Sequence, residues 1–173
     1  DEPKRIYDAA VQKDVEDWNT AMGVQLTVAK GETIGITNGE FAVGNGSSVD
    51  INSYATLIAF KGATLKFAAS ANSKSFGLNR DYGRYVLDGA TFDVVTKNVQ
   101  RYFGNSAASR PKFCSWELMN GSQLVSQTGG GRYEYRWIVG YGNSMKLVDS
   151  TLDASKGGVT SASGWKEAGS TVT

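Results

Sequence analysis

The sequence predicts an all-β solenoid, a fold in which short strands stack in parallel along one axis. Three observations predict it. The chain holds 21 glycines but only 2 prolines, apolar residues alternate with others over short stretches, and a three-part motif returns at irregular intervals. Many glycines allow many tight turns between strands, and the scarcity of proline leaves the strands with their backbone N–H donors. The returning motif favours a repeat architecture over other all-β folds.

Each part of the motif occurs at four places. The first part is an apolar residue followed by glycine, at Val43-Gly44, Phe76-Gly77, Phe103-Gly104 and Val139-Gly140. The second part is an apolar-x-apolar step, at Val49/Ile51, Tyr85/Leu87, Trp116/Leu118 and Met145/Leu147. The third part is a small, a polar and an apolar residue, at Ala55-Thr56-Leu57, Ala90-Thr91-Phe92, Ser122-Gln123-Leu124 and Ser150-Thr151-Leu152. Partial copies of the third part occur at residues 62–65 and 169–172.

The spacing of the motif fits stacked units. The glycines at 44, 77, 104 and 140 are 33, 27 and 36 residues apart, which lies in the range of repeat proteins. One unit cannot bury its apolar face alone, so stacking is expected to align Leu65, Phe92, Leu124 and Leu152 in one interior. An antiparallel β-sandwich is the alternative, because it also has short, evenly spaced strands.

The repeat resembles the glycine-rich passenger repeats of bacterial autotransporters and related secreted surface proteins. The stretches "VGNGSSVDINSYATLIA" (residues 43–59) and "IVGYGNSMKLVDSTLDAS" (residues 138–155) are closest to it, and it covers about residues 41–155. The resemblance implies a right-handed parallel β-helix of the pectin-lyase-like kind, located outside the cell or on the cell surface. It implies no catalytic residue.

The first 23 residues predict an N-terminal amphipathic capping helix. Apolar residues recur there at steps of 4, 4, 3 and 4, at Tyr7, Val11, Val15, Trp18 and Met22. Pro3 suits a first helical turn and Gly23 suits a helix end. A helix over residues 1–23 would cover the apolar end of the solenoid coils, which are expected over residues 24–173. An extended lead-in strand, or a helix packed on the side of the solenoid, is the alternative.

The other end of the sequence, "AGSTVT", falls inside a repeat-like motif. A bare end of a solenoid presents unpaired backbone groups and apolar surface. We therefore expect a fragment of a longer protein or an assembling subunit. Such an end would contact another copy of the chain, or a neighbouring surface protein, end to end.

Composition excludes several kinds of chemistry. The chain has no histidine and one cysteine, which rules out Ser-His-Asp catalysis, histidine metal sites, thiolate zinc sites and an intrachain disulfide. Cys114 lies between aromatic residues and is expected to pack as a small apolar group. We expect no catalytic residue, metal or cofactor. A net charge of +1 argues against nucleic acid as a partner, and no apolar stretch is long enough for a membrane span.

Two groups of residues are candidates for ligand binding. In "RYEYRW", Tyr133 and Tyr135 alternate with Arg132 and Arg136, so one side of a strand would carry an aromatic row on which sugar rings can stack. The alternative is that these rings point into the core. Arg84 and Tyr102 belong to a region rich in Arg and Tyr that could bind an acidic polysaccharide. Interleaved aspartates there allow a plain ion-pair surface instead.

These observations predict an extracellular structural or adhesive β-solenoid that assembles with other chains or binds a surface polymer. A carbohydrate-binding module is one alternative. A polysaccharide lyase of the β-helix type is another, in which Asp88, Asp93 and Arg84 would be the nearest candidates for a calcium or proton-transfer site. Their spacing is not diagnostic of such a site.

Overall fold

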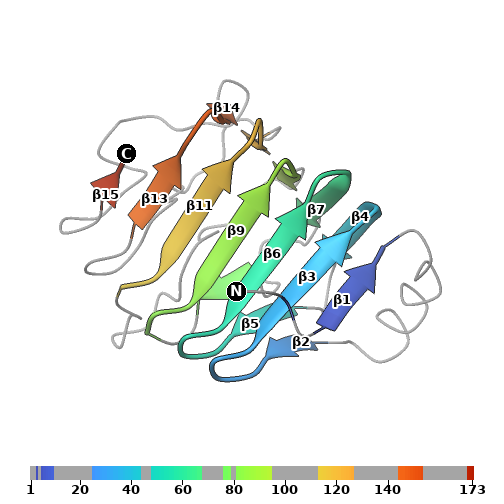
Figure 1. Ribbon diagram of the computed structural model, residues 1–173, viewed down its shortest axis with the longest axis vertical. Helices are drawn as coiled ribbons and strands as arrows, with labels where there is room; N and C mark the ends of the chain where they lie inside the picture. Colours follow the sequence, from blue (N-terminus) through green and yellow to red (C-terminus); the bar gives the residue numbers. More distant parts are fainter. Residues whose placement is uncertain are drawn as a thin grey trace, which may run out of the picture.

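A computed structural model describes residues 3, 5–9, 25–43, 48–67, 76–78, 81–94, 113–126, 144–153 and 171–173. Within these residues the fold is all-β, and the strands form three sheets (Figure 1). The seven-stranded sheet has the order β1 (Arg5–Asp8), β3 (Thr33–Thr37), β6 (Thr56–Phe60), β9 (Arg84–Asp88), β11 (Ser115–Met119), β13 (Ser144–Leu147) and β15 (Thr171–Val172). The five-stranded sheet has the order β14 (Thr151–Asp153), β12 (Gln123–Ser126), β10 (Thr91–Val94), β7 (Ala63–Phe67) and β4 (Gly39–Val43). The three-stranded sheet has the order β2 (Gln25–Val28), β5 (Ser48–Ile51) and β8 (Phe76–Leu78).

Every strand pair among the described residues is parallel. From β2 to β10 the chain enters the three-stranded, the seven-stranded and the five-stranded sheet in turn and then repeats that order. We call one such passage a rung. The antiparallel sandwich is therefore wrong, because consecutive strands lie in different sheets and each pairs with the equivalent strand of the next rung.

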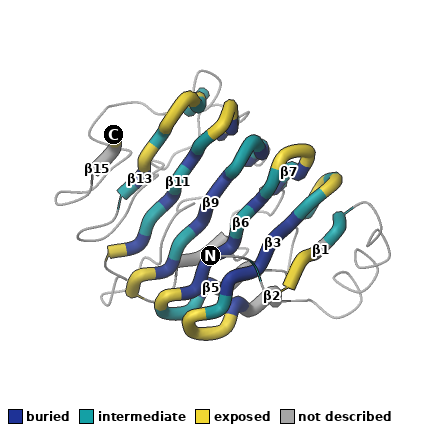
Figure 2. The backbone as a smooth tube through the Cα atoms, viewed as in Figure 1, coloured by how far each residue is buried: buried dark blue, intermediate teal, exposed yellow. Residues whose placement is uncertain are grey.

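The register places equivalent side chains of successive rungs side by side. Leu65 pairs with Phe92, Phe92 with Leu124, and Leu124 with Leu152, which confirms the predicted alignment. The first three are at most 1% exposed, while Leu152 is half-buried on the edge strand. Figure 2 shows buried positions recurring along the strands of the seven-stranded sheet. These inward side chains form one continuous apolar interior.

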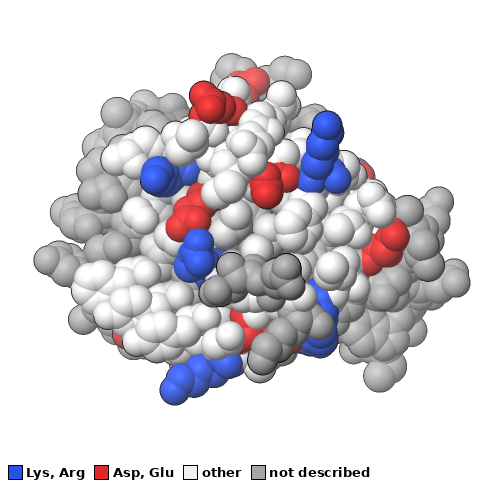
Figure 3. Space-filling view, viewed as in Figure 1, with Lys and Arg blue, Asp and Glu red and all other residues white. Residues whose placement is uncertain are grey.

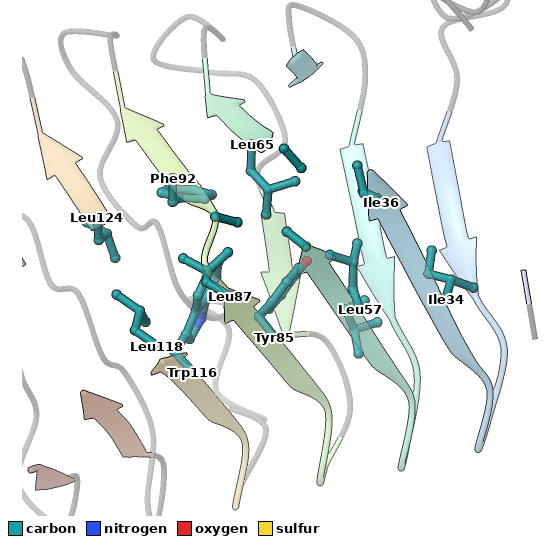
Figure 4. Packing of buried hydrophobic residues seen from close by; sticks show 14 of the residues in the cluster. Ile34, Ile36, Leu57, Leu65, Tyr85, Leu87, Phe92, Trp116, Leu118 and Leu124 are labelled. Atoms are coloured by element: carbon teal, nitrogen blue, oxygen red, sulfur yellow. The ribbon is translucent and has the colours of Figure 1, made fainter. Parts of the chain in front are cut away.

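Aromatic rings join two sheets inside the core. Tyr85 and Trp116 occupy paired positions of β9 and β11, and their rings stack with centroids 4.2 Å apart. Phe92 of the five-stranded sheet meets the Trp116 ring edge-on at 5.2 Å (Figure 4). Both arrangements are favourable ring geometries. Because all three side chains are at most 1% exposed, they hold the two inner faces together.

The small residues of the third part of the motif lie at the corner between the seven-stranded and the five-stranded sheet. A residue with positive φ comes first, at Gly62, Gly89, Gly121 and Asp149. A small residue follows each of them. At Ser122, which is fully buried, the hydroxyl oxygen lies 3.1 Å from the Ala90 nitrogen, which donates to it, and 2.8 Å from the Leu87 carbonyl oxygen. A larger side chain here would push adjacent rungs apart.

The phase predicted for one full copy of the motif is wrong. Residues 55–57 lead into β6 of the seven-stranded sheet, whereas the other three copies of the small-polar-apolar part lead into β10, β12 and β14 of the five-stranded sheet. Likewise, Val49 and Ile51 lie in β5 of the three-stranded sheet, not in the seven-stranded one. The true equivalent of residues 90–92 is the partial copy at 63–65. The physical cause is that the corners before and after the seven-stranded sheet both commonly place a small residue after one with positive φ, as at Tyr54-Ala55 and Gly89-Ala90.

The predicted capping helix is wrong at its start. Residues Arg5–Asp8 form β1, which pairs with β3, and the Ala9 nitrogen donates to the Thr37 oxygen at 2.8 Å. A strand satisfies the backbone groups along the free edge of β3, which a helix could not do. Residues 10–24, the rest of that prediction, lie outside the described residues. None of the described segments is a helix long and apolar enough to cross a membrane.

The last described residues extend the seven-stranded sheet. β15 pairs with β13, and the Leu147 nitrogen donates to the Thr173 oxygen at 2.8 Å. Thr171 and Val172 of the repeat-like motif thus form a strand of a further rung, but in the seven-stranded sheet, so this partial copy is not equivalent to residues 90–92 of the five-stranded sheet. The expectation of an end-to-end partner stays a prediction.

The shared interior yields a direct test on β12. Leu124→Asp would bury an unpaired charge, so we expect the free energy of unfolding to fall by several kcal/mol, enough to abolish cooperative melting. Gln123→Asp changes the adjacent, exposed position and should alter stability by at most about 0.5 kcal/mol. Thermal melting followed by circular dichroism measures both. Equal melting temperatures for the two variants would contradict a buried role for Leu124.

Candidate ligand-binding surface

The corner that precedes the seven-stranded sheet carries an unusual residue type. The residue two positions before each of β3, β6, β9 and β11 has positive φ, with values of 70° at Gly31, 59° at Tyr54, 65° at Tyr82 and 59° at Phe113. A left-handed conformation favours glycine, because in other residues Cβ crowds the backbone. Three of these four positions nevertheless hold an aromatic residue. We call Tyr54, Tyr82 and Phe113 the aromatic column.

The rings of the aromatic column stack on one another outside the core. The Tyr54 and Tyr82 ring centroids are 4.8 Å apart with an angle of 6° between the rings, and Tyr82 and Phe113 are 5.3 Å apart at 21°. Tyr54 is 59% exposed, Tyr82 42% and Phe113 47%. The first spacing equals the distance between neighbouring strands of a sheet. The rungs therefore set the spacing of the rings.

Backbone hydrogen bonds between rungs continue through this corner and hold the aromatic column in place. The Gly31 nitrogen donates to the Ser53 oxygen at 3.0 Å, and the Arg84 nitrogen donates to the Ala55 oxygen at 2.9 Å. The Asn52 side chain donates to the Val28 oxygen at 3.0 Å, which links two rungs just before the column. The residues that follow the three rings in the chain are buried: Ala55, Gly83 and Cys114. The rings thus project from a rigid base.

The energetics of the column are nearly balanced. A left-handed conformation costs a residue other than glycine roughly 1–2 kcal/mol. A stacked aromatic pair contributes about 0.5–1.5 kcal/mol beyond the area that it buries. Stacking therefore offsets the backbone cost without producing a large gain. Exposed rings that add little to stability are candidates for contact with another molecule.

Of the six predicted ligand-binding residues, only Arg84 lies in the described part of the chain. It begins β9, and its guanidinium lies 2.7 Å from a Glu117 carboxylate oxygen on β11. At this position the ion-pair alternative describes the arginine better than an anion site does. The other five lie outside the described residues: Tyr102, Arg132, Tyr133, Tyr135 and Arg136.

Sequence reasoning missed Tyr54 and Phe113. A signal was present, because each of Tyr54-Ala55, Tyr82-Gly83 and Phe113-Cys114 is an aromatic residue followed by a small one, just before a strand. Aromatic residues are rare at positive φ, so this pattern does not resemble a turn. Only the register of the rungs shows that the three rings share one column.

Charges of both signs mix on the face of the seven-stranded sheet (Figure 3). Lys66 and Glu40, on the five-stranded sheet, lie 3.4 Å apart, and the Asn120 side chain donates to an Asp88 carboxylate oxygen at 2.7 Å. Over the described ranges, no group of three or more acidic, histidine or cysteine side chains could hold a metal ion. Asp88 and Asp93 therefore form no acidic cluster of the kind that calcium needs within this part of the chain.

Cys114 follows Phe113 in the chain and is 1% exposed. The pKa of its thiol is raised to about 11, mainly by burial and also by the nearby charge of Asp81, against the opposing effect of backbone donors at Gly83 and Tyr82. The thiol is therefore neutral at physiological pH. It packs as a small apolar group and is not activated as a nucleophile.

No protein-family model, curated protein or solved structure matches this chain. What the aromatic column can bind therefore has to be inferred from its own chemistry: flat apolar rings, phenolic hydroxyls and a rigid base.

Two substitutions at Tyr82 separate backbone cost from ring stacking. Both Tyr82→Ala and Tyr82→Gly lose the two stacked contacts, but only glycine relieves the left-handed conformation. We expect Tyr82→Gly to be more stable than Tyr82→Ala by about 1 kcal/mol in urea unfolding. A larger loss of unfolding free energy for Tyr82→Gly than for Tyr82→Ala would contradict the positive φ at position 82.

The Cys114 thiol gives a pH dependence with a defined sign. Its pKa is higher in the folded protein than the ordinary value of 9.0, so the folded state holds the proton more tightly. Its contribution to stability is complete below pH 9 and is lost as pH rises towards 11. Urea unfolding between pH 8 and 11 should show this loss, and Cys114→Ala should remove it. An identical pH dependence in the variant would contradict the assignment.

Proposed function

We propose that this chain is an extracellular or cell-surface structural or adhesive protein, built as a right-handed parallel β-helix, that binds a surface polymer. The observation that carries the proposal is the aromatic column, a row of exposed rings held at a fixed spacing on a rigid corner. Rings displayed in this way cost conformational strain and bury little area, so a role in contact with a ligand accounts for them.

The right-handed form of the fold is supported by topology. Parallel strands joined by crossover connections are right-handed in nearly all known cases. The successive entry of the chain into three parallel sheets is what a β-helix requires. The resemblance of the repeat to autotransporter passenger repeats points the same way and also suggests a location outside the cell.

A polysaccharide is the polymer that suits the column best. Sugar rings have apolar C–H faces that pack against aromatic rings, and their hydroxyls can exchange hydrogen bonds with phenolic oxygens. A polymer running along the corner would meet the exposed edge of one ring per rung, because both faces of the Tyr82 ring are covered by Tyr54 and Phe113. The near-neutral chain gives no comparable reason for nucleic acid.

Assembly with other chains is the second candidate. Leu152 lies on β14, the edge strand of the five-stranded sheet, and is only partly buried. Sheet edges favour pairing with a further strand. A lyase activity has weaker support, because the described residues contain no group of three or more acidic side chains for calcium and Arg84 is paired with Glu117.

Binding to immobilised polysaccharides tests the proposal. We expect the protein to be retained on at least one acidic or neutral polysaccharide. The triple variant Tyr54→Ala, Tyr82→Ala, Phe113→Ala should bind at least 10-fold more weakly, because it removes the whole column. The matched control is the double variant Ile6→Ala, Val148→Ala, which removes exposed apolar side chains elsewhere. Equal retention of both variants would count against the column, and no retention of the unaltered protein on any polysaccharide would count against the proposed function.

A further inference from the structure

The aromatic column ends beside a rung whose corner residue, Gly31, has no side chain. Gly31 occupies the same corner position as the three rings, two residues before β3, and has the same positive φ. A Cβ atom added to Gly31 would meet no other atom within 4 Å. The described residues therefore leave room for a side chain to begin at this position.

Tyr54 presents a free ring face to this space. Tyr82 has a neighbouring ring on each face, whereas Tyr54 stacks only on Tyr82 within the described residues. The exposed fractions agree with this difference, at 59% for Tyr54 against 42% for Tyr82. A flat ligand ring on Tyr54 would take the place of a side chain at position 31 and continue the column by one step.

The residue before this corner position is a lysine. Lys30 precedes Gly31, is exposed, and has no ion pair among the described residues. The nearest carboxylate in sequence, Glu32, is already engaged, because it pairs with Arg5 and accepts a hydrogen bond from the Ala29 nitrogen at 3.0 Å. Lys30 thus carries an exposed positive charge one residue from the Gly31 end of the column.

We propose that Tyr54, Gly31 and Lys30 form a binding site for a single acidic sugar residue, a pyranose that carries a carboxylate. The apolar face of the sugar stacks on the Tyr54 ring above Gly31, and the Lys30 ammonium donates to the carboxylate. This inference rests on the proposed polysaccharide binding and names the site and the ligand class. A neutral sugar would use the ring alone and bind more weakly.

The most informative variant fills the site without removing a contact. Gly31→Tyr places a fourth ring in the column at a φ that three aromatic residues already adopt, so the protein should fold. Calorimetric titration with a hyaluronan tetrasaccharide, which contains glucuronate, is expected to show at least 10-fold weaker binding for Gly31→Tyr and for Tyr54→Ala. If Gly31→Tyr fails to fold, Tyr54→Ala still tests whether the ligand binds on the Tyr54 ring. Val148→Ala, at a distant exposed position, should bind normally.

Lys30→Gln tests the class of sugar. We expect it to weaken binding of the hyaluronan tetrasaccharide about 5-fold or more and to leave binding of neutral chitotetraose unchanged. Equal effects on the two probes, or none, would overturn the acidic-sugar assignment.

These measurements distinguish an error in the Tyr54 site from an error in the proposed polysaccharide binding. If polysaccharides bind but Gly31→Tyr and Tyr54→Ala behave like the unaltered protein, this site is wrong and another surface holds the polymer. If the unaltered protein binds neither acidic nor neutral polysaccharide, both proposals are wrong.

Discussion

The structure depends on keeping successive rungs in register. Side chains along a strand alternate between the two faces of a sheet, so a slip of one residue would turn every buried side chain outward. Each rung must therefore have corners that return the next strand in the same phase. The pairs that run through Leu65, Phe92, Leu124 and Leu152 show that this phase is kept across four rungs. The corners on either side of the seven-stranded sheet have a left-handed residue, which in most rungs is followed by a small one, although Glu32 follows Gly31.

The same constraint creates the exposed surface. A left-handed residue at a fixed point of each rung directs its side chain away from the core, and the rung spacing then places successive side chains at stacking distance. Glycine would satisfy the backbone at this corner, as Gly31 does. Tyrosine and phenylalanine at the other three positions add ring surface that the fold does not need. We propose that this additional exposed ring surface is what binds sugars.

Sequence reasoning predicted the parallel stacking and its main buried column, because period-2 alternation and the small-polar-apolar motif depend only on neighbouring residues. It misplaced residues 55–57, because the two corners use the same residue types. It assigned a helix to Arg5–Asp8, since helical spacing in a short segment does not show that β3 offers a free edge. It missed Tyr54 and Phe113, because only contacts between rungs distant in sequence bring these rings together. Arg84 was identified, but its pairing with Glu117 also depends on the next rung.

Distances across the five-stranded sheet test the stacking most directly. The outward positions Glu40, Thr64, Thr91, Gln123 and Thr151 lie opposite one another on β4, β7, β10, β12 and β14. Spin labels at Glu40 paired in turn with Thr91, Gln123 and Thr151 should give separations that rise by about 4.8 Å for each strand, to about 19 Å between the outermost backbone positions. A distance that fails to increase from Thr91 to Thr151 would contradict parallel, in-register rungs, and the aromatic column would then have no structural basis.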